Sequence, residues 1–121
     1  MRIEISSFAD QGNINEERVG LKVLQQCNLK YYAVYHTEKT SNGFFNRPKH
    51  VLWFTPREVN PGDEIVLYTK KGIDNTALRE GKTVHFMYWG LEESIMSPND
   101  CLVLSEINNW SVTRFMDSEK E

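Results

Sequence analysis

The chain has 121 residues, a formal net charge of −3 and 40% hydrophobic residues. This length allows one domain with a core of its own, the composition excludes a disordered chain, and the acidic balance disfavours nucleic acid or anionic membranes as partners. The sequence contains no apolar run long enough for a membrane helix, and from its polar start, Met1–Glu4, we expect no signal peptide. We expect a cytoplasmic protein if the chain is complete, and a secreted protein or part of a larger one if it was trimmed.

The first part of the chain predicts three strands separated by turns. Arg2–Phe8 alternates apolar and polar residues, and Val19–Val23 does the same. A helix over Asn15–Cys27 is the competing interpretation, because its leucines also fit a helical spacing. Lys30–Thr37 is rich in Tyr and Val, which favour strands, and Glu38–Lys49 has the Asn, Gly and Pro residues of a loop.

The strongest pattern lies in the middle of the chain. Val51–Thr55 and Glu64–Thr69 are strand-like runs joined by the turn Asn60–Asp63. Proline fixes φ at one turn position and glycine accepts the positive φ at the next, so Pro61-Gly62 is a strong turn signal. We expect the two runs to form a hairpin-like pair.

The remainder predicts a loop at 73–81, strands at Thr83–Gly90 and Cys101–Ile107, and a last strand at Trp110–Phe115. The full pattern is about eight short strands with turns between them, typical of an all-β, antiparallel sandwich. We therefore expect one domain over residues 1–116, followed by an acidic, disordered tail at 117–121.

Two cysteines, Cys27 and Cys101, are too few for a disulfide scaffold and do not form a C-x-x-C motif. Both fall in strand-like runs, where a free thiol behaves as a small hydrophobe. We expect free thiols, with a Cys27–Cys101 bridge as the alternative.

Several segments, in order, resemble the lamin tail domain, an immunoglobulin-like β-sandwich family. The resemblance covers roughly Glu17 to Phe115. Its central motif is P-G-D-E-I-V-L within Val59–Tyr68, similar to the family's P-G-E-x-V-V-L segment. The other matching segments are Val19-x-Leu21-x-Val23, Asn28–Val34, Tyr88–Leu91 and Ser97–Leu104.

The resemblance implies an immunoglobulin-like fold and a non-catalytic domain, since members are associated with DNA and protein partners or are appended to secreted hydrolases. The chain departs from the family pattern at three places. Met96 stands where a second tryptophan is frequent, Pro98-Asn99 replaces an Asn/Gly turn, and Tyr31 replaces a glycine.

No motif for catalysis, metal or cofactor emerges. His36, His50 and His85 have no ligand spacing, although His36 and His85 both lie in strand-like runs and could meet across strands. Adjacent carboxylates such as Glu16-Glu17 point to opposite faces of a strand and do not form an acid–base pair. Asp63 is expected to shape the turn that precedes it. We predict no enzyme activity, no catalytic residue, no metal site and no cofactor.

Candidate binding residues are basic or aromatic and lie in loops. Residues 30–82 hold nine Lys/Arg against six Asp/Glu, and this mild excess is most simply solvated surface. Adjacent aromatics in a polar loop pin it to the core or form a contact surface, whereas Trp53, Trp110 and the cluster Met87-Tyr88-Trp89 are expected in the core. The candidates are Lys70, Lys71, Arg79, Lys82, Arg47, Lys49, Phe44 and Phe45.

Three functional hypotheses follow from these patterns. The first is a protein-interaction module with an unidentified protein partner or a second copy of itself, acting through an edge strand or an aromatic loop. The second is nucleic-acid binding through the basic rim Lys70–Lys82. The third is a hydrolase built from histidines and carboxylates that converge in space.

Overall fold

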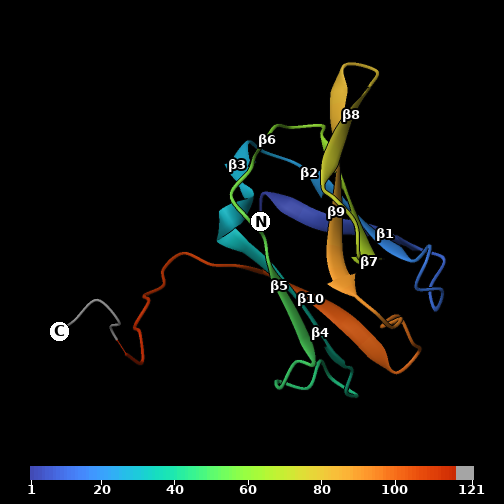
Figure 1. The fold of residues 1–121 in the computed structure, drawn as a ribbon, viewed down its shortest axis with the longest axis vertical. Helices are drawn as coiled ribbons and strands as arrows, with labels where there is room; N and C mark the ends of the chain where they lie inside the picture. Colours follow the sequence, from blue (N-terminus) through green and yellow to red (C-terminus); the bar gives the residue numbers. More distant parts are fainter. Residues whose placement is uncertain (117–121) are drawn as a thin grey trace.

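Two β-sheets lie face to face and form the body of the molecule (Figure 1). The computed structural model describes residues 1–116. Within them one 3-10 turn, Leu29–Tyr31, precedes β4, and there is no α-helix. The expectation of an all-β sandwich is confirmed. The strands are β1 (Ile3–Ala9), β2 (Arg18–Val23), β3 (Cys27–Asn28), β4 (Tyr32–Glu38), β5 (His50–Trp53), β6 (Glu58–Val59), β7 (Glu64–Lys70), β8 (Asn75–Arg79), β9 (Lys82–Leu91) and β10 (Asp100–Glu106).

The larger sheet has the order β1-β2-β7-β9-β8 and the smaller one β10-β4-β5, while β3 and β6 form a short ribbon. All neighbouring strands are antiparallel except β7 and β9, which are parallel. The sandwich expected from the sequence therefore forms, with one parallel pair that its antiparallel pattern did not include. β8 follows β7 in the sequence and pairs with the edge of β9 that faces away from β7. Because β8 and β9 form an antiparallel hairpin, β9 returns beside β7 in the same direction as β7.

The core lies between the sheets and follows the period-two alternation of the strands. Val19, Leu21 and Val23 of β2 are buried, and Tyr32 and Val34 of β4 face them from the other sheet. Each fully buried aliphatic side chain of this kind contributes roughly 1.5–3 kcal/mol. The strand interpretation of residues 19–23 is thus confirmed over the helix, and the two cysteines are free thiols, as expected.

The two runs of the central pattern do not pair with each other. β5 belongs to the smaller sheet, beside β4, whereas β7 belongs to the larger sheet, between β2 and β9. The chain between them crosses from one sheet to the other and forms β6 on the way. The expected turn does form, with φ of 89° at Gly62 and a hydrogen bond of 3.0 Å from the Asp63 N–H to the Asn60 carbonyl, but it connects layers and does not close a hairpin.

The expected loop at 73–81 contains strand β8, which forms a hairpin with β9. Glu80 and Gly81 make the turn with φ of 53° and 81°, the positive values of a two-residue hairpin turn. All five residues of β8 are exposed. Because neither face is buried, the sequence has no apolar alternation there to reveal a strand.

The predicted last strand, Trp110–Phe115, is not a strand. It lies in an extended segment, residues 107–116, that we call the arm, and that has no strand partner in the described chain. The arm leaves the end of β10 and runs away from both sheets (Figure 1). The tail predicted at 117–121 lies outside the described residues.

Candidate functional site

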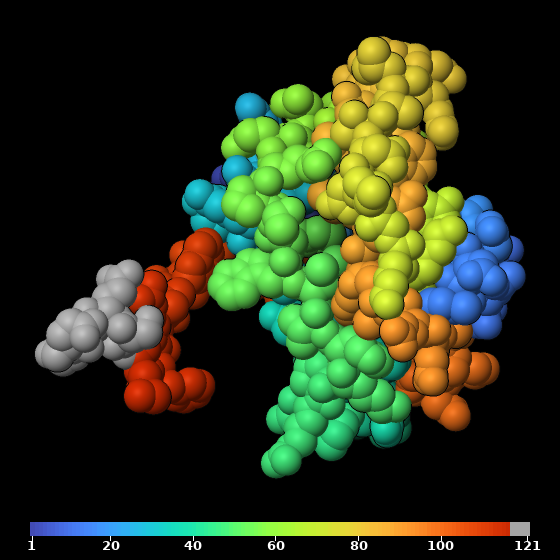
Figure 2. Space-filling view, viewed as in Figure 1, coloured from blue at the N-terminus to red at the C-terminus, as the bar shows by residue number. Residues whose placement is uncertain are grey.

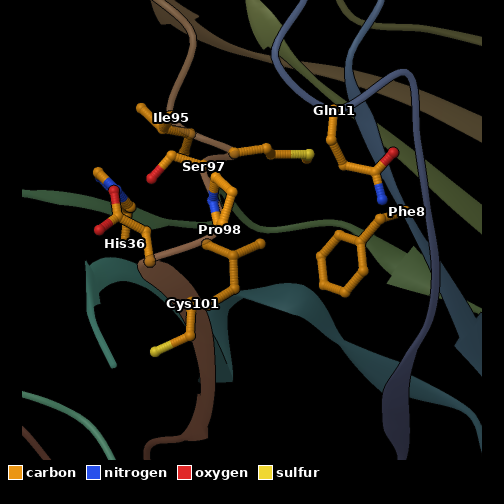
Figure 3. A pocket seen from close by; sticks show the side chains of 10 residues that line it. Phe8, Gln11, His36, Ile95, Ser97, Pro98 and Cys101 are labelled. Carbon is orange, nitrogen blue, oxygen red and sulfur yellow. The ribbon is translucent and has the colours of Figure 1, made fainter. Parts of the chain in front are cut away.

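A pocket opens between the sheets where their edge strands β1 and β10 face each other. Its volume is about 450 Å³. Figure 3 shows Phe8 and Gln11 on one side, and the loop before β10 with His36 and Cys101 on the other. Most of the lining is apolar, from Phe8, Ile95, Met96, Pro98 and Leu102, while Gln11, His36, Ser97 and Asp100 add polar atoms. Size and lining are those of a ligand pocket.

Both strands that flank the pocket have a free edge. Among residues 1–116, β1 pairs with β2 alone and β10 pairs with β4 alone. Leu102 lies directly opposite His36 in the register of β10 and β4, so both side chains are on the inner face of the smaller sheet. Backbone donors and acceptors of two unpaired edges therefore border an apolar cavity.

The loop that forms one wall of the pocket is held by the buried carboxylate of Glu17. Its oxygens accept hydrogen bonds from Ser94 Oγ (2.6 Å) and the Ile95 N–H (3.0 Å). Two further donors, Thr69 Oγ1 at 2.7 Å and the Gly12 N–H at 3.0 Å, complete the set. Burial alone would raise the pKa of Glu17, but these hydrogen bonds outweigh it and the pKa is lowered. Glu17 is thus an ionised anchor for the wall of the pocket.

Two polar side chains of the pocket lining, His36 and Asp100, belong to a hydrogen-bonded chain that continues to His50 outside the lining. His36 Nε2 lies 2.7 Å from Asp100 Oδ2, and His36 Nδ1 lies 3.0 Å from Nδ1 of His50, whose ring stacks on it. An ionised carboxylate only accepts, so His36 Nε2 donates to Asp100, and a hydrogen bond between the two Nδ1 atoms requires a proton on one of them. The hydrogen bond from His36 lowers the pKa of Asp100. Both ring nitrogens of His36 have hydrogen-bond partners. Of the four nitrogens in the two rings, Nε2 of His50 is the one with no such partner among the described residues.

The other histidine with a buried carboxylate partner, His85, is on the larger sheet. Its Nε2 lies 3.2 Å from Asp63 Oδ2 and its Nδ1 lies 3.4 Å from the Arg57 guanidinium. Asp63 also accepts from the Asn60 N–H at 3.0 Å, so it shapes the turn, as predicted. Burial would raise the Asp63 pKa, yet its hydrogen bonds lower it.

His36 and His85 therefore belong to two separate clusters, and the meeting of these histidines considered from the sequence does not occur. Within the described residues no group of three or more His, Cys, Asp and Glu side chains is placed to hold a metal ion.

The basic residues proposed from the sequence do not gather into one rim. Lys70 lies at the last position of β7, and its ammonium group is over the Tyr68 ring. Lys71 pairs with Glu92 at 3.0 Å. Arg79 and Lys82 face each other at the tip of the β8–β9 hairpin. In the parallel register of β7 and β9 that tip is at the opposite end of the sheet from Lys70.

The second pair of basic candidates is also divided. Arg47 is exposed in the loop before β5. Lys49 lies 3.5 Å from Glu38 and 4.0 Å from Asp100, so its charge is directed to carboxylates beside the pocket.

Phe44 and Phe45 do not pin their loop to the core, because both rings are about half exposed. Backbone contacts hold the loop instead, with Thr37 Oγ1 donating to the Phe45 carbonyl at 2.6 Å and the Phe45 N–H to the Glu38 carbonyl at 2.8 Å. Their exposure leaves these rings available for contact, as the binding prediction requires.

Aromatic residues expected in the core lie partly on the surface. Trp53 and Trp110 are 45% and 43% exposed, with ring centroids 5.1 Å apart in an edge-on arrangement, and Trp53 Nε1 donates to the Lys30 carbonyl at 2.7 Å. Tyr88 stacks on Tyr68. Both are half-buried and lie on the outer face of the larger sheet. The core position expected for Met87 is confirmed, and Trp89 packs against the core while remaining half-buried.

The comparisons with known proteins give no match among family models, curated proteins or solved structures. No helix in residues 1–116 is long and apolar enough to cross a membrane.

Proposed function

We propose that the chain is a non-catalytic interaction module, an immunoglobulin-like sandwich of the lamin tail type, that binds an extended apolar segment of a protein partner. The observation that carries the proposal is the apolar pocket between the free edges of β1 and β10. The order of the lamin-tail-like segments along the sequence supports the family.

The chemistry of strand addition fits this place. An extended segment that pairs with β10 gains main-chain hydrogen bonds, and every second side chain points inward. Leu102 marks the inward positions of β10, since it lies opposite His36. A segment on this edge therefore directs an apolar side chain between the sheets, toward Phe8.

The two alternatives have less support. Nucleic-acid binding needs phosphate contacts from clustered cations, but the four basic residues lie at two ends of a sheet and Lys71 is paired with Glu92. A hydrolase needs a base and a nucleophile in reach of each other. Cys101 borders the pocket, but it lies opposite Thr37 in the register, so its thiol leaves β10 on the other face of the sheet from the His36 ring.

A matched pair of substitutions tests the proposal. Phe8 and Phe45 are the same residue type and equally exposed at 45%, but only Phe8 lines the pocket. A phage-displayed library of random peptides is selected on the intact chain, and the affinity of the selected peptides is then measured. We expect apolar residues at alternate positions, and Phe8→Asp weakens binding about tenfold or more while Phe45→Asp leaves it unchanged. If Phe45→Asp weakens peptide binding and Phe8→Asp does not, the peptides bind at the aromatic loop, and the proposal that they bind in the pocket is refuted.

A further inference from the structure

The arm presents large apolar side chains to solvent. Val112, Phe115 and Met116 are 82%, 106% and 85% exposed. The arm is fixed at its start, where the Ile107 N–H donates to the Tyr31 carbonyl at 2.7 Å and Trp110 packs on Trp53. Beyond that point it stands clear of the body (Figure 2). Soluble monomers seldom expose a run of this kind without a partner surface.

The arm has the composition of a strand that lacks a partner. Residues 110–116 combine Trp, Val, Thr and Phe, the types that favour strands. Ten residues in extended form reach at most about 35 Å, enough to cross to a neighbouring molecule. The arm also points away from the pocket of its own molecule, since it leaves on the side opposite the β1–β2 turn and the β9–β10 loop (Figure 1).

The charges of the arm and of the pocket edge are complementary. Residues 83–106, which include β10 and the wall of the pocket, contain four Asp/Glu and no Lys or Arg. Glu92 is paired with Lys71, and Asp100 with His36 and Lys49, so the negative charge left for a partner is that of the exposed Glu93 and Glu106. The arm contains Arg114 and no carboxylate. Opposite charges on neighbouring strands attract and like charges repel, so pairing of the arm with β10 is electrostatically more favourable than pairing of an acidic strand with β10 would be.

We propose that the occupant of the pocket is the arm of a second copy of this chain. The arm adds to the free edge of β10 in its partner and places the Phe115 ring in the pocket beside Phe8, and the partner returns its own arm, which gives a closed two-fold dimer. This exchange rests on the proposed binding function and names its partner. It also accounts for a strand-type sequence that has no strand to pair with in the described monomer.

The test uses full-length variants and sedimentation velocity across a range of concentrations. We expect the wild-type chain to form a concentration-dependent dimer. Phe115→Asp removes the occupant and Phe8→Asp alters the pocket, and each variant alone is expected to dimerise about tenfold more weakly or worse. Mixing the two variants restores one arm–pocket contact, so heterodimers form where neither variant dimerises. Ile73→Asp, at an apolar position that is also highly exposed but lies outside both surfaces, is the control and leaves the dimer intact.

Two results would overturn the exchange: a wild-type chain that stays monomeric at about 1 mM, or a dimer that Phe115→Asp does not weaken. Circular dichroism of each variant shows that it is folded. A monomeric chain that still binds selected peptides through Phe8 refutes the exchange and leaves the proposed function standing. A wild-type chain that neither dimerises nor binds selected peptides through Phe8 refutes both the arm exchange and the proposed function.

Discussion

Asp100 Oδ2 lies 2.7 Å from His36 Nε2, and this partly buried hydrogen bond joins two side chains that line the pocket. Asp100 comes from the edge strand β10, and His36 from the strand beside it. The bond therefore couples the integrity of the pocket to the protonation of one carboxylate.

Asp100→Asn is expected to lower the free energy of unfolding by about 1–3 kcal/mol at neutral pH, because the charge-assisted bond is lost. The pKa of Asp100 is lowered in the folded state. Its contribution is therefore complete above the unfolded pKa of about 4 and is lost as pH falls through the folded value. Urea unfolding at neutral pH and near pH 3 should show the difference from wild type shrinking in acid. The exposed carboxylate Glu38 provides the control, Glu38→Gln, and a difference that is constant with pH would contradict this role for Asp100.

Glu17→Gln is expected to destabilise the fold by roughly 1–3 kcal/mol and to loosen the wall of the pocket. An amide cannot accept all four hydrogen bonds that the carboxylate receives, so the Ile95 N–H loses a strong acceptor. Amide hydrogen exchange at Ile95 should become faster, whereas Glu16→Gln, at the exposed neighbouring position, should leave it unchanged. Unaltered protection of Ile95 in Glu17→Gln would show that another contact holds the loop.

Trp110→Ala is expected to release the start of the arm at a cost of about 0.5–1.5 kcal/mol, the contribution of an aromatic pair. Trp53 then loses its edge-on neighbour, and the NMR resonance of its Nε1–H group, which donates to the Lys30 carbonyl, should shift. Phe115→Ala, at a fully exposed position of the same arm, should leave that resonance unchanged. If the Trp53 resonance is the same in the wild type and in Trp110→Ala, Trp110 does not cover Trp53 in solution.

The divided basic residues predict little affinity for nucleic acid. Retention of the chain on a DNA column should be negligible at about 0.15 M salt, where the screening length is about 8 Å. Lys70→Glu/Lys71→Glu and Arg79→Glu/Lys82→Glu should leave that behaviour unchanged. Salt-dependent retention that the first double variant abolishes would instead support the basic rim as a binding surface.

Much of the fold could be predicted from local sequence because each inner strand keeps a strict alternation. Val19, Leu21 and Val23 show their buried face directly. The pairing of strands could not be predicted in the same way, since β5 and β7 are adjacent in the pattern but belong to different sheets. Which sheet a strand joins depends on contacts far apart in the sequence, and β8 has no buried face that would identify it.

The same alternation contained a signal that Glu17 and His36, which were considered from the sequence only as an adjacent carboxylate and as a strand histidine, are buried and need partners. Glu17 stands two positions before Val19, and His36 stands two positions after Val34, so both continue a buried row. A polar residue in such a row is expected to have a buried partner. The partners themselves, Ser94 for Glu17 and Asp100 for His36, are more than sixty positions away, and no local pattern identifies them.

The measurement that tests the binding account most directly is an amide NMR titration of the full-length Phe115→Asp variant, whose arm no longer occupies the pocket, with a peptide selected from the library. We predict that the shifted resonances cluster on β10, the neighbouring 95–98 loop and Phe8, and that new hydrogen-exchange protection appears along the free edge of β10. Shifts confined to the loop of Phe44 and Phe45, or to the outer face with Tyr68 and Tyr88, would contradict the account and move the binding surface there.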